Sequence, residues 1–376
     1  MITVLYQLNQ LGYGGTEKAI LTFIRNIDKK RFAVKLFFVT DRHTSKYYRR
    51  KLFALFSQKY KKIFNRKYVT DFIRRKDFEE IIGENNIFLG TKKDFFRICS
   101  EIKPDIIHFN RGIENEFYTK QVDLIPQDIR LCETNIFGAP SSKDYLVRLS
   151  SIFFVSKWLL SKSKWSEVYE RNVLYNPIIK PSCTNNLRRQ LNLPETAIVI
   201  GRISRPGLDD GSFYNTIINR FESNEVYFLT IGASPELQEA QVNNKKAIFL
   251  PTTTSEIMLS MFYNTINILF HYRNEGETFG MNIAEAMIHG KPVISHTSEV
   301  DNAQIELLDD CDHPCGIIVH NITDTTEYYD KLNELISNSD LRLELGKNGK
   351  TKALQTYEES LMTKQLESLY KNIVSN

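Results

Sequence analysis

The sequence predicts an α/β protein built from two doubly wound domains, and three observations lead to this prediction. The chain has 376 residues, about twice the usual length of a single domain. The apolar runs that we expect to be strands are mostly continuous rather than alternating, which is typical of parallel strands covered on both faces. Helical periodicity fills most of the gaps between these runs, so strands and helices alternate along the chain.

The first series of strands and helices starts at the N-terminus. The apolar run Ile2–Leu8 leads into the glycine-rich string LGYGG, after which we expect a helix. The apolar face of this helix is formed by Ile20, Phe23, Ile24 and Ile27. The other strands of this series are predicted at 33–40, 105–110, 129–135 and 152–156.

The second series begins near Ala197. Its strands are predicted at 197–204, 226–233, 247–251, 266–272, 292–296 and 316–320. We interpret the segment 176–196, rich in proline and asparagine, as the linker, and the tail 324–373 as helical and amphipathic. The predicted domains are 1–178, 179–355 and a C-terminal helix over 356–376 that could pack back on the N-terminal domain. Because doubly wound sheets bind ligands at the carboxyl ends of their strands, we expect the ligand in a cleft between the domains.

Composition excludes several classes of protein. A net charge of +4 is too small to indicate a nucleic-acid partner. The five cysteines are odd in number, and the C-x3-C pair at 311–315 has no second pair nearby, so we expect reduced thiols and no zinc site. The N-terminus does not resemble a signal peptide, and no uncharged apolar run approaches the ~20 residues that cross a bilayer. We therefore expect a cytoplasmic protein, soluble or peripheral on the membrane.

The stretch 42–76 is strongly basic, with thirteen Lys or Arg against one acid, Asp71. Its apolar positions recur at helical spacing, namely Leu52, Phe53, Phe56, Tyr60, Ile63 and Phe64. A basic amphipathic helix suits an anionic membrane surface, which is the interpretation we favour. A solvated helix that packs its apolar stripe on its own domain is nearly as well supported, and nucleic acid is the least favoured alternative.

Two glutamates eight positions apart, Glu277 and Glu285, suggest a ligand. Glu277 lies in a loop after the strand 266–272, and Glu285 lies on the helix that we expect over Met281–His289. The first free N–H groups of that helix form an anion site worth up to ~2 kcal/mol. A phosphate there, flanked by two hydroxyl-bearing groups that carboxylates could bind, describes a nucleoside diphosphate sugar. The alternative is that both glutamates are exposed charges.

The surrounding string, ETFGMNIAEAMIHGKPVI, closely resembles the E-x7-E signature of the retaining glycosyltransferases of family four, which have the GT-B fold. The similarity continues along nearly the whole chain in the family's order. The other similar strings are LGYGGTEKAI (11–20), KPDIIHFN (103–110), FVSKWL (154–159), VLYNPI (173–178), IGRISR (200–205) and NSDLRLELGKNGKTKALQTY (338–357).

This resemblance implies a GT-B fold, with two Rossmann-like domains facing a central cleft. It implies a retaining, hexosyltransferase-like enzyme that moves a sugar from a UDP- or GDP-linked donor to an acceptor hydroxyl of a glycan, a lipid-linked saccharide or a protein glycan. The family is drawn with attack on the same face of the sugar, and the leaving phosphate accepts the proton. No metal or other cofactor is then required, and the string DDCD (309–312) is interpreted as a solvated turn.

The resemblance also implies roles for individual residues. Glu277 would contact the donor sugar and Glu285 the nucleotide ribose, while Arg202 would neutralise the diphosphate. Backbone groups for the sugar and the phosphates would come from Thr278, Phe279, Gly280 and Met281. The glycine-rich loop of the first domain would approach the phosphate through Gly14, Gly15 and the helix start at Thr16. An ordinary tight turn remains the alternative for these glycines.

The sequence departs from the family at two places. The family often has GR-x-x-x-x-K-G, whose lysine joins the arginine on the diphosphate, whereas this chain has GRISRPGLDDG. Arg205 is the candidate for the missing charge. Many members also carry a histidine near the donor sugar, and here we predict Asn135 as its replacement in a catalytic role. His108 lies on a different strand and is interpreted as an ordinary strand-end histidine.

Two rival functions remain open. A degenerate transferase would bind a nucleotide sugar or a partner enzyme without turnover, and the altered Arg/Lys pair supports this alternative. A nucleotide-sugar epimerase on the same fold is less favoured, because it would need further acids and bases at the sugar. A nicotinamide dehydrogenase is disfavoured, since GYGG lacks the G-x-G-x-x-G spacing.

Overall fold

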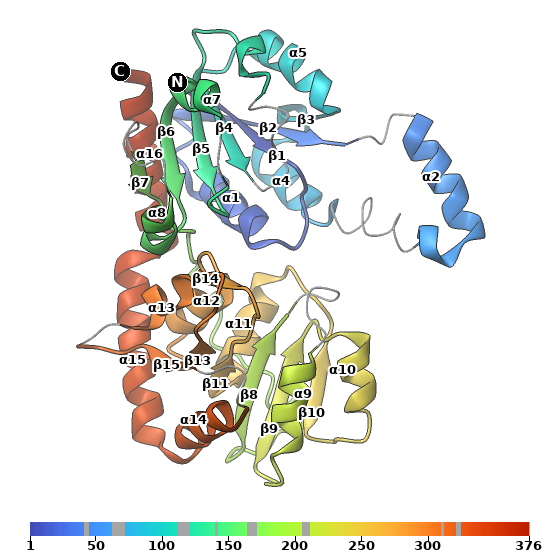
Figure 1. Ribbon diagram of the computed structural model, residues 1–376, viewed down its shortest axis with the longest axis vertical. Coiled ribbons are helices and arrows are strands. Elements are labelled where there is room, and N and C mark those ends of the chain that lie inside the picture. Colours follow the sequence, from blue (N-terminus) through green and yellow to red (C-terminus); the bar gives the residue numbers. More distant parts are fainter. Residues whose placement is uncertain are drawn as a thin grey trace. The chain divides into compact units, whose positions relative to one another are not determined.

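The computed structural model describes residues 1–40, 45–61, 72–111, 120–139, 142–163, 171–204, 211–309, 312–320 and 325–375. The chain forms two compact units, which Figure 1 shows coloured along the sequence. Unit 1 consists of Met1–Pro177 together with Glu359–Asn376, and unit 2 of Ile178–Glu358. The chain therefore leaves unit 1, builds unit 2 and returns to unit 1 with its last helix.

Within the described residues, the sheet of unit 1 has seven strands, all parallel, in the order β3-β2-β1-β4-β5-β6-β7. Their bounds are β1 Ile2–Leu8, β2 Phe32–Val39, β3 Ile87–Gly90, β4 Ile106–Arg111, β5 Arg130–Asn135, β6 Leu149–Phe154 and β7 Arg171–Val173. The strand order reverses between β1 and β4, the position at which doubly wound sheets bind ligands.

Helices accompany this sheet. They are α1 Gly15–Asn26, α2 Ser45–Phe56, α4 Arg75–Ile82, α5 Lys92–Ile102, α7 Lys143–Arg148, α8 Lys157–Lys162 and α16 Glu359–Ser375, with short 3-10 turns at Glu84–Asn86 and Val122–Leu124. The predicted apolar face of α1 is buried, with Ile20 at 3% and Ile24 at 1% exposure. Helix α16 packs against α1 (Figure 1), and it buries Leu366 and Tyr370 completely. The last helix of the chain thus completes the core of the unit that contains the first strand.

The described sheet of unit 2 has six parallel strands in the order β10-β9-β8-β11-β13-β15, again with the reversal beside its first strand. Their bounds are β8 Ile198–Ile203, β9 Val226–Ile231, β10 Ala247–Leu250, β11 Ile268–Phe270, β13 Val293–His296 and β15 Gly316–Val319. A separate short pair joins β12 Gly276–Glu277 to β14 Asp301–Asn302.

The helices of unit 2 are α9 Ser212–Asn219, α10 Pro235–Ala240, α11 Glu256–Thr265, α12 Met281–Ile288, α13 Ala303–Leu308, α14 Thr325–Ser337 and α15 Ser339–Thr356. One part of the core forms where strand side chains such as Ile200 and Ile268 meet Tyr214 of α9 and Leu332 of α14, all fully buried. Continuous β-branched and aromatic runs along the strands produce this core, because each strand is covered on both faces.

The segment 176–196, which we predicted as the linker, packs on unit 2 over most of its length. The backbone N–H of Ser182 donates to Oγ of Ser260 at 2.9 Å, and that of Leu187 donates to Oγ1 of Thr265 at 2.7 Å. Leu187 is 2% exposed. Much of the predicted linker is therefore anchored to unit 2, although its proline- and asparagine-rich composition is typical of a loop.

The predicted fold class is confirmed: the protein is α/β, with a doubly wound parallel sheet in each of two units. The helix predicted over Met281–His289 is α12, and the helical tail is α14, α15 and α16. Strands β3 and β7 were not predicted. The predictions for DDCD (309–312) and for much of the stretch 42–76 fall partly outside the described residues.

Candidate functional site

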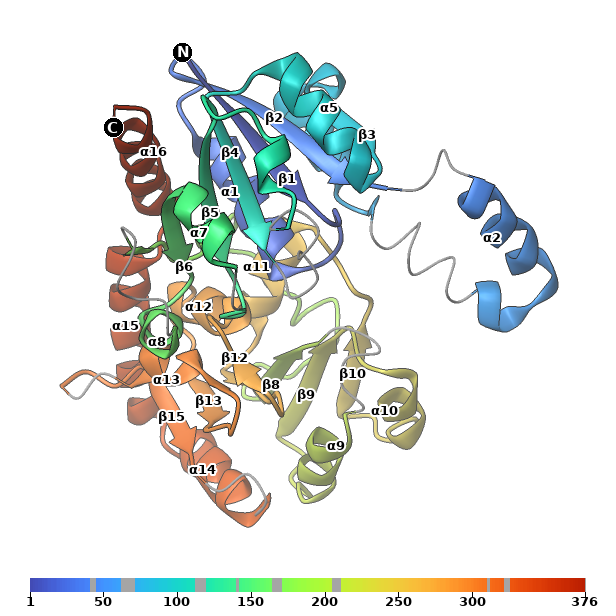
Figure 2. The same ribbon diagram turned by 45° about the horizontal axis from the view of Figure 1, so that its top comes forward.

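The candidate site of unit 2 lies at the carboxyl ends of β8 and β11, where the strand order of its sheet reverses. Strand β8 ends just after Arg202, and β11 is followed directly by His271. Strand β12 and helix α12 come next in the chain, and Figure 2 labels both in unit 2 together with β8. Nδ2 of Asn282, on the first turn of α12, donates to the carbonyl oxygen of Ile203 at 3.3 Å. This bond holds the start of α12 at the end of β8.

Glu277 is held by three contacts. Its Oε1 lies 3.3 Å from Nε2 of His271, and its Oε2 accepts a hydrogen bond from Nη1 of Arg273 at 3.2 Å. Its backbone N–H donates to Oε1 of Gln304 at 3.0 Å. The side chain is 20% exposed, so the carboxylate is oriented by its neighbours and still reachable from solvent.

A second histidine, His296, fixes the backbone of Arg273. Its Nδ1 lies 2.7 Å from the carbonyl oxygen of Thr297, and its Nε2 lies 3.2 Å from the backbone nitrogen of Arg273. Because a carbonyl only accepts and an amide N–H only donates, the ring carries its proton on Nδ1 and is neutral. Burial lowers the pKa of His296 to about 4, so the ring stays uncharged at neutral pH.

The N-terminus of α12 has the backbone features of an anion site. Gly280 is the N-cap residue with φ of 98°, a left-handed conformation that favours glycine. The first helical bond runs from the N–H of Ala284 to the carbonyl of Gly280 at 3.1 Å, so the N–H groups of 281–283 have no acceptor within the helix. These N–H groups, together with the helix dipole, are suited to a phosphate.

The two residues before Gly280 differ in their surroundings. Thr278 is half-buried. Phe279 is 2% exposed, and its ring packs edge-on against Tyr357 at 5.6 Å between centroids. Only backbone groups of Phe279 could therefore serve a ligand, which agrees with the kind of contact that the sequence resemblance implies for it.

Glu285 lies on the buried face of α12 and is 7% exposed. Its Oε2 accepts a hydrogen bond from the hydroxyl of Tyr263 at 2.9 Å, and this hydroxyl also lies 3.3 Å from the carbonyl of Asn282. Burial and the nearby carboxylate raise the pKa of Tyr263 well above its usual value, so the phenol remains a donor. The carboxylate of Glu285 is thus held in place by α11, the helix that carries Tyr263.

Arg202, predicted to neutralise a diphosphate, is 3% exposed near the end of β8. Its guanidinium lies 5.1 Å from the centroid of the Tyr214 ring, a cation–π contact. Arg205, the candidate for the second charge, lies outside the described residues.

In unit 1, the predicted glycine-rich loop leads directly into α1. Gly14 is the N-cap residue, and the N–H of Lys18 donates to its carbonyl at 3.2 Å. A Cβ added to Gly14 would displace the carboxylate of Glu17, which lies directly over this glycine. Gly15 and Thr16 form the first turn of α1.

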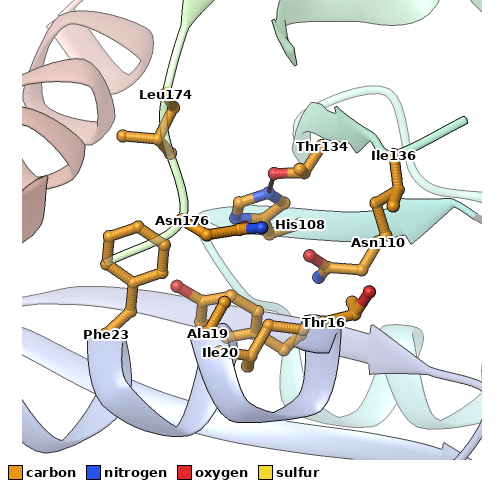
Figure 3. Close-up of a pocket in the computed structure, with 11 residues that line it drawn as sticks. Thr16, Ala19, Ile20, Phe23, His108, Asn110, Thr134, Ile136, Leu174 and Asn176 are labelled. Atoms are coloured by element: carbon orange, nitrogen blue, oxygen red, sulfur yellow. Dashed lines mark hydrogen bonds between the residues drawn. The ribbon is translucent and has the colours of Figure 1, made fainter. Parts of the chain in front are cut away.

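A small pocket lies beside this turn, between α1 and the carboxyl ends of β4 and β5 (Figure 3). Its polar lining consists of Tyr6, Thr16, His108, Asn110, Thr134 and Asn176. Asn110 is 6% exposed, and its amide nitrogen has no hydrogen-bond partner among the described residues. A buried donor of this kind needs an oxygen from a ligand or a water.

His108 belongs to a buried chain of hydrogen bonds in the wall of this pocket. Its Nε2 lies 2.8 Å from Oγ1 of Thr134 and its Nδ1 lies 2.6 Å from the hydroxyl of Tyr370, which in turn donates to the hydroxyl of Tyr6 at 2.6 Å. Burial lowers the pKa of His108 to about 3 and raises those of both tyrosines. The chain is therefore uncharged, and it ties α16 to β1 and β4.

Asn135, predicted as a catalytic residue, is fully buried at the end of β5. Its Nδ2 donates to Oε1 of Glu133 at 3.0 Å and to the carbonyl of Ala139 at 3.1 Å, and its Oδ1 accepts from the N–H of Gly138 at 2.7 Å. Glu133 also accepts from the hydroxyl of Tyr145 at 2.7 Å. These bonds shape the loop that follows β5.

In unit 2 the structure brings together Glu277, the start of α12 and a set of neighbours that sequence reasoning missed: His271, Arg273, His296 and Gln304. Both histidines stand at the ends of predicted strands, which is the one signal that could have identified them. In the parts of the chain that the structure describes, no cluster of three or more His, Cys, Asp or Glu could hold a metal ion. None of the described helices combines the length and apolar character needed to cross a bilayer.

One family model matches part of the chain by sequence. Residues 217–352, which run from the end of α9 into α15 and include both glutamates, match the model of the family described as glycosyl transferases group 1. Comparison with curated protein sequences gave no match. The family match supports a glycosyltransferase.

Solved structures share the fold over the whole chain. HepE of Anabaena, crystallised in complex with UDP and glucose, is 14% identical, with a TM-score of 0.71 over 99% of this chain and 100% of its own. Sucrose-phosphate synthase from Thermosynechococcus elongatus is 13% identical, with a TM-score of 0.69 over 100% of both chains. A glycosyltransferase from Rickettsia africae is 14% identical, with a TM-score of 0.69 over 100% of this chain and 99% of its own. At such identities the likeness is one of fold, and it agrees with the predicted GT-B class.

Proposed function

We propose that the protein is a retaining glycosyltransferase that moves a sugar from a UDP- or GDP-linked donor to an acceptor hydroxyl. The observation that carries this proposal is the oriented carboxylate of Glu277 immediately before the open N-terminus of α12. Both features lie inside the segment that matches the group 1 glycosyl transferases. An anion site next to a carboxylate that accepts hydroxyl hydrogen bonds suits a diphosphate joined to a sugar.

The proposed roles follow from the surroundings of each residue. The N–H groups at the start of α12 hold the diphosphate, together with Arg202 and with Arg205, for which no contact is described. Glu277 binds hydroxyls of the transferred sugar, with His271 and Arg273 fixing its orientation. Glu285 binds the ribose hydroxyls, and Thr278, Phe279, Gly280 and Met281 supply backbone groups.

Catalysis then rests on position and on charge. The acceptor oxygen attacks the anomeric carbon on the face that the phosphate leaves, the bond to the phosphate breaks, and the acceptor proton passes to the leaving phosphate. Glu277 and Glu285 are assigned to different ends of the donor, so they do not form the pair of a double displacement. A helix N-terminus and an arginine can stabilise the departing diphosphate without a metal.

Unit 1 is proposed to meet the acceptor, whether a glycan, a lipid-linked saccharide or a protein glycan. Gly14, Gly15 and Thr16 are its proposed contribution to donor binding, and Asn135 shapes the loop after β5. The unsatisfied amide of Asn110 would bind an acceptor oxygen or a water. We further propose a cytoplasmic protein that is peripheral on the membrane.

A degenerate transferase without turnover is the second candidate. The altered string GRISRPGLDDG favours it, because a diphosphate that is poorly neutralised leaves slowly. A nucleotide-sugar epimerase is a weaker candidate. Incubation of the pure protein with labelled donors and candidate acceptors separates the three: the transferase transfers the label and releases nucleoside diphosphate, the epimerase interconverts sugars, and the degenerate protein binds without turnover.

A thermal-shift panel of UDP, GDP, ADP and their sugars identifies the donor. A ligand present at a hundred times its Kd stabilises the folded protein by about 2.7 kcal/mol, which raises Tm measurably. We expect one base to stand out from the panel. No shift with any nucleotide or nucleotide sugar would contradict the transferase and a degenerate protein that binds a nucleotide sugar.

A further inference from the structure

Helix α2 presents a continuous apolar stripe to solvent. Tyr48, Leu52, Leu55 and Phe56 recur at the spacing i, i+4, i+7 and i+8, which places them on one face of a helix. Their exposed fractions are 61%, 54%, 75% and 81%. Large apolar side chains gathered in this way on a described surface indicate a contact with something outside the chain.

The contrast with α1, a helix of the same length in the same unit, is direct. The apolar face of α1 is packed on the core, where Ile20 is 3% and Ile24 is 1% exposed. Both helices are amphipathic, but only α1 has its apolar face covered among the described residues. The second interpretation of the basic stretch, in which the apolar stripe packs on its own domain, therefore does not hold for the described stripe of α2.

Positive charge surrounds the stripe. Residues 45–61 contain six Lys or Arg and no Asp or Glu. Arg49 and Lys51 border the stripe on its two sides, and Lys59 and Lys61 follow in the next described turn; all four are exposed. An apolar stripe with basic borders and no acidic residue is complementary to a layer that has an apolar interior and anionic groups at its surface.

We propose that this stripe docks α2 on an anionic lipid bilayer. Tyr48, Leu52, Leu55 and Phe56 enter the boundary between head groups and acyl chains, and the bordering cations contact the phosphates. A second copy of the same helix is disfavoured as the occupant, because it would bring two acid-free basic surfaces together. Nucleic acid would satisfy the charges but leave the apolar stripe uncovered.

This docking specifies how the protein would reach the peripheral membrane location proposed above. It depends on that part of the proposed function alone, so it can hold whether or not the protein transfers sugars. If it holds, unit 1 works at a surface where saccharides carried on lipids are concentrated. Among the three proposed acceptor classes, docking therefore selects the lipid-linked saccharide.

The test is flotation of the full-length protein with lipid vesicles, without donor or acceptor. Vesicles of phosphatidylcholine alone are compared with vesicles of equal parts phosphatidylcholine and phosphatidylglycerol. We expect the protein to float with the anionic vesicles only, and binding to weaken as salt rises, because exposed charges are screened beyond ~10 Å at 0.1 M salt.

A matched pair of double variants assigns the binding to the stripe. Leu55→Glu with Phe56→Glu should weaken binding to anionic vesicles about tenfold or more, since it removes apolar contact and adds two repelled charges. Val242→Glu with Leu343→Glu makes the same change in charge at side chains that are 75% and 72% exposed in unit 2, and it should leave binding unchanged. Unchanged melting of both variants shows that each still folds.

Three results would overturn the proposal: equal binding to neutral and anionic vesicles, wild-type binding by the Leu55→Glu, Phe56→Glu variant, or no binding at low salt. Light scattering that finds a dimer in the wild type and a monomer in that variant would instead assign the stripe to a second copy. Transfer to acceptors dispersed in detergent, with a lipid-linked saccharide among them, is measured separately without vesicles and tests the transferase, so failure of either proposal is recognisable without the other.

Discussion

The two glutamates of the E-x7-E string have different neighbours, and neither is an ordinary exposed charge. Glu277 is oriented by a histidine and an arginine, and it is 20% exposed. Glu285 is 7% exposed and accepts from a buried tyrosine. Alignment of these carboxylates before any ligand arrives reduces the entropy that ligand binding must lose.

Glu277→Gln should lower turnover about a hundredfold while nucleotide affinity changes little, because it disturbs the group proposed to position the sugar. Steady-state kinetics together with UDP or GDP binding measure the two effects. Glu275→Gln is the matched control, since Glu275 is two residues away, is 61% exposed and also lies near Arg273, at 3.7 Å. Wild-type turnover by Glu277→Gln would remove Glu277 from the site.

Tyr263→Phe should destabilise the protein by about 1–3 kcal/mol, because it leaves the buried carboxylate of Glu285 without the phenol that donates to it. It should also weaken nucleotide binding if Glu285 holds the ribose. Urea unfolding and nucleotide titration measure these effects. Tyr329→Phe loses a hydroxyl whose bond to the carbonyl of Arg220 is long, 3.4 Å, and partly exposed, so its cost should be smaller. Equal costs would contradict the role of Tyr263.

Stability should fall as the pH drops below about 6.5, the ordinary pKa of histidine. Burial lowers the folded-state pKa of His108 to about 3 and that of His296 to about 4. Between those values and 6.5 the unfolded chain binds protons that the folded chain does not, so acid favours unfolding by about 1.4 kcal/mol per pH unit for each histidine. Urea unfolding at pH 7, 6 and 5 measures the slope. A flat profile would contradict the neutral buried rings.

At the scale of elements, the loop between β11 and α12 depends on its glycines. Gly276 lies in this loop, and Gly290 follows the end of α12. Both glycines have a φ of 69°, in the left-handed region. A Cβ on Gly276 would collide with the carbonyl oxygen of Asp301, which pairs β14 with β12, whereas one on Gly290 would have its nearest neighbour at 3.7 Å.

Gly276→Ala should therefore cost more stability than Gly290→Ala, which bears about 1 kcal/mol of backbone strain alone. The collision must displace β12 and with it Glu277, so donor affinity or turnover should fall only in Gly276→Ala. Thermal unfolding and kinetics of the two variants give the comparison. Equal behaviour would show that the β12–β14 pair does not position Glu277.

The strands and helices that the sequence predicted follow continuous apolar runs or strong helical periodicity, even where few residues pair, as in the three residues of β11. The strand predicted at 266–272, which contains β11, and the helix α12 are clear in the sequence. An apolar run and a helix-ending glycine are local signals. Strands β3 and β7 have only four and three residues. They are recognised by their pairing with β2 and β6, and pairing between distant segments leaves no local pattern.

The same limit applies to the site. That Glu277 belongs to a functional loop follows from its motif, but its contact with Gln304 joins residues 27 positions apart through the β12–β14 pair. The burial of Asn135 depends on Glu133 and Ala139, and on how the loop after β5 folds back. Composition and spacing carry no information about such packing.

At the scale of the whole molecule, α16 makes unit 1 discontinuous in sequence. Leu366 is fully buried in unit 1, while Leu361 on the same helix is 41% exposed. Leu366→Ala should cost about 2–5 kcal/mol and Leu361→Ala about 0.5 kcal/mol or less. In Leu366→Ala, amide hydrogen exchange should become faster in β1 and β4 and should stay unchanged in β8 and β11. Faster exchange in unit 2 alone would contradict the assignment of α16 to unit 1.

The return of the chain to unit 1 also fixes an order of events during synthesis. The ribosome releases β1 first and α16 last, so every residue of unit 2 has been made before Tyr370 can close the hydrogen-bond chain with Tyr6 and His108. Domains commonly mature from the N-terminus as they emerge. Here unit 2 can fold before unit 1 is complete. Until α16 is made, the side of α1 that α16 will cover remains exposed to solvent. A nascent chain interrupted after Glu358, just before α16, would carry a complete second unit and an incomplete first one, a state that chaperones and proteases can recognise.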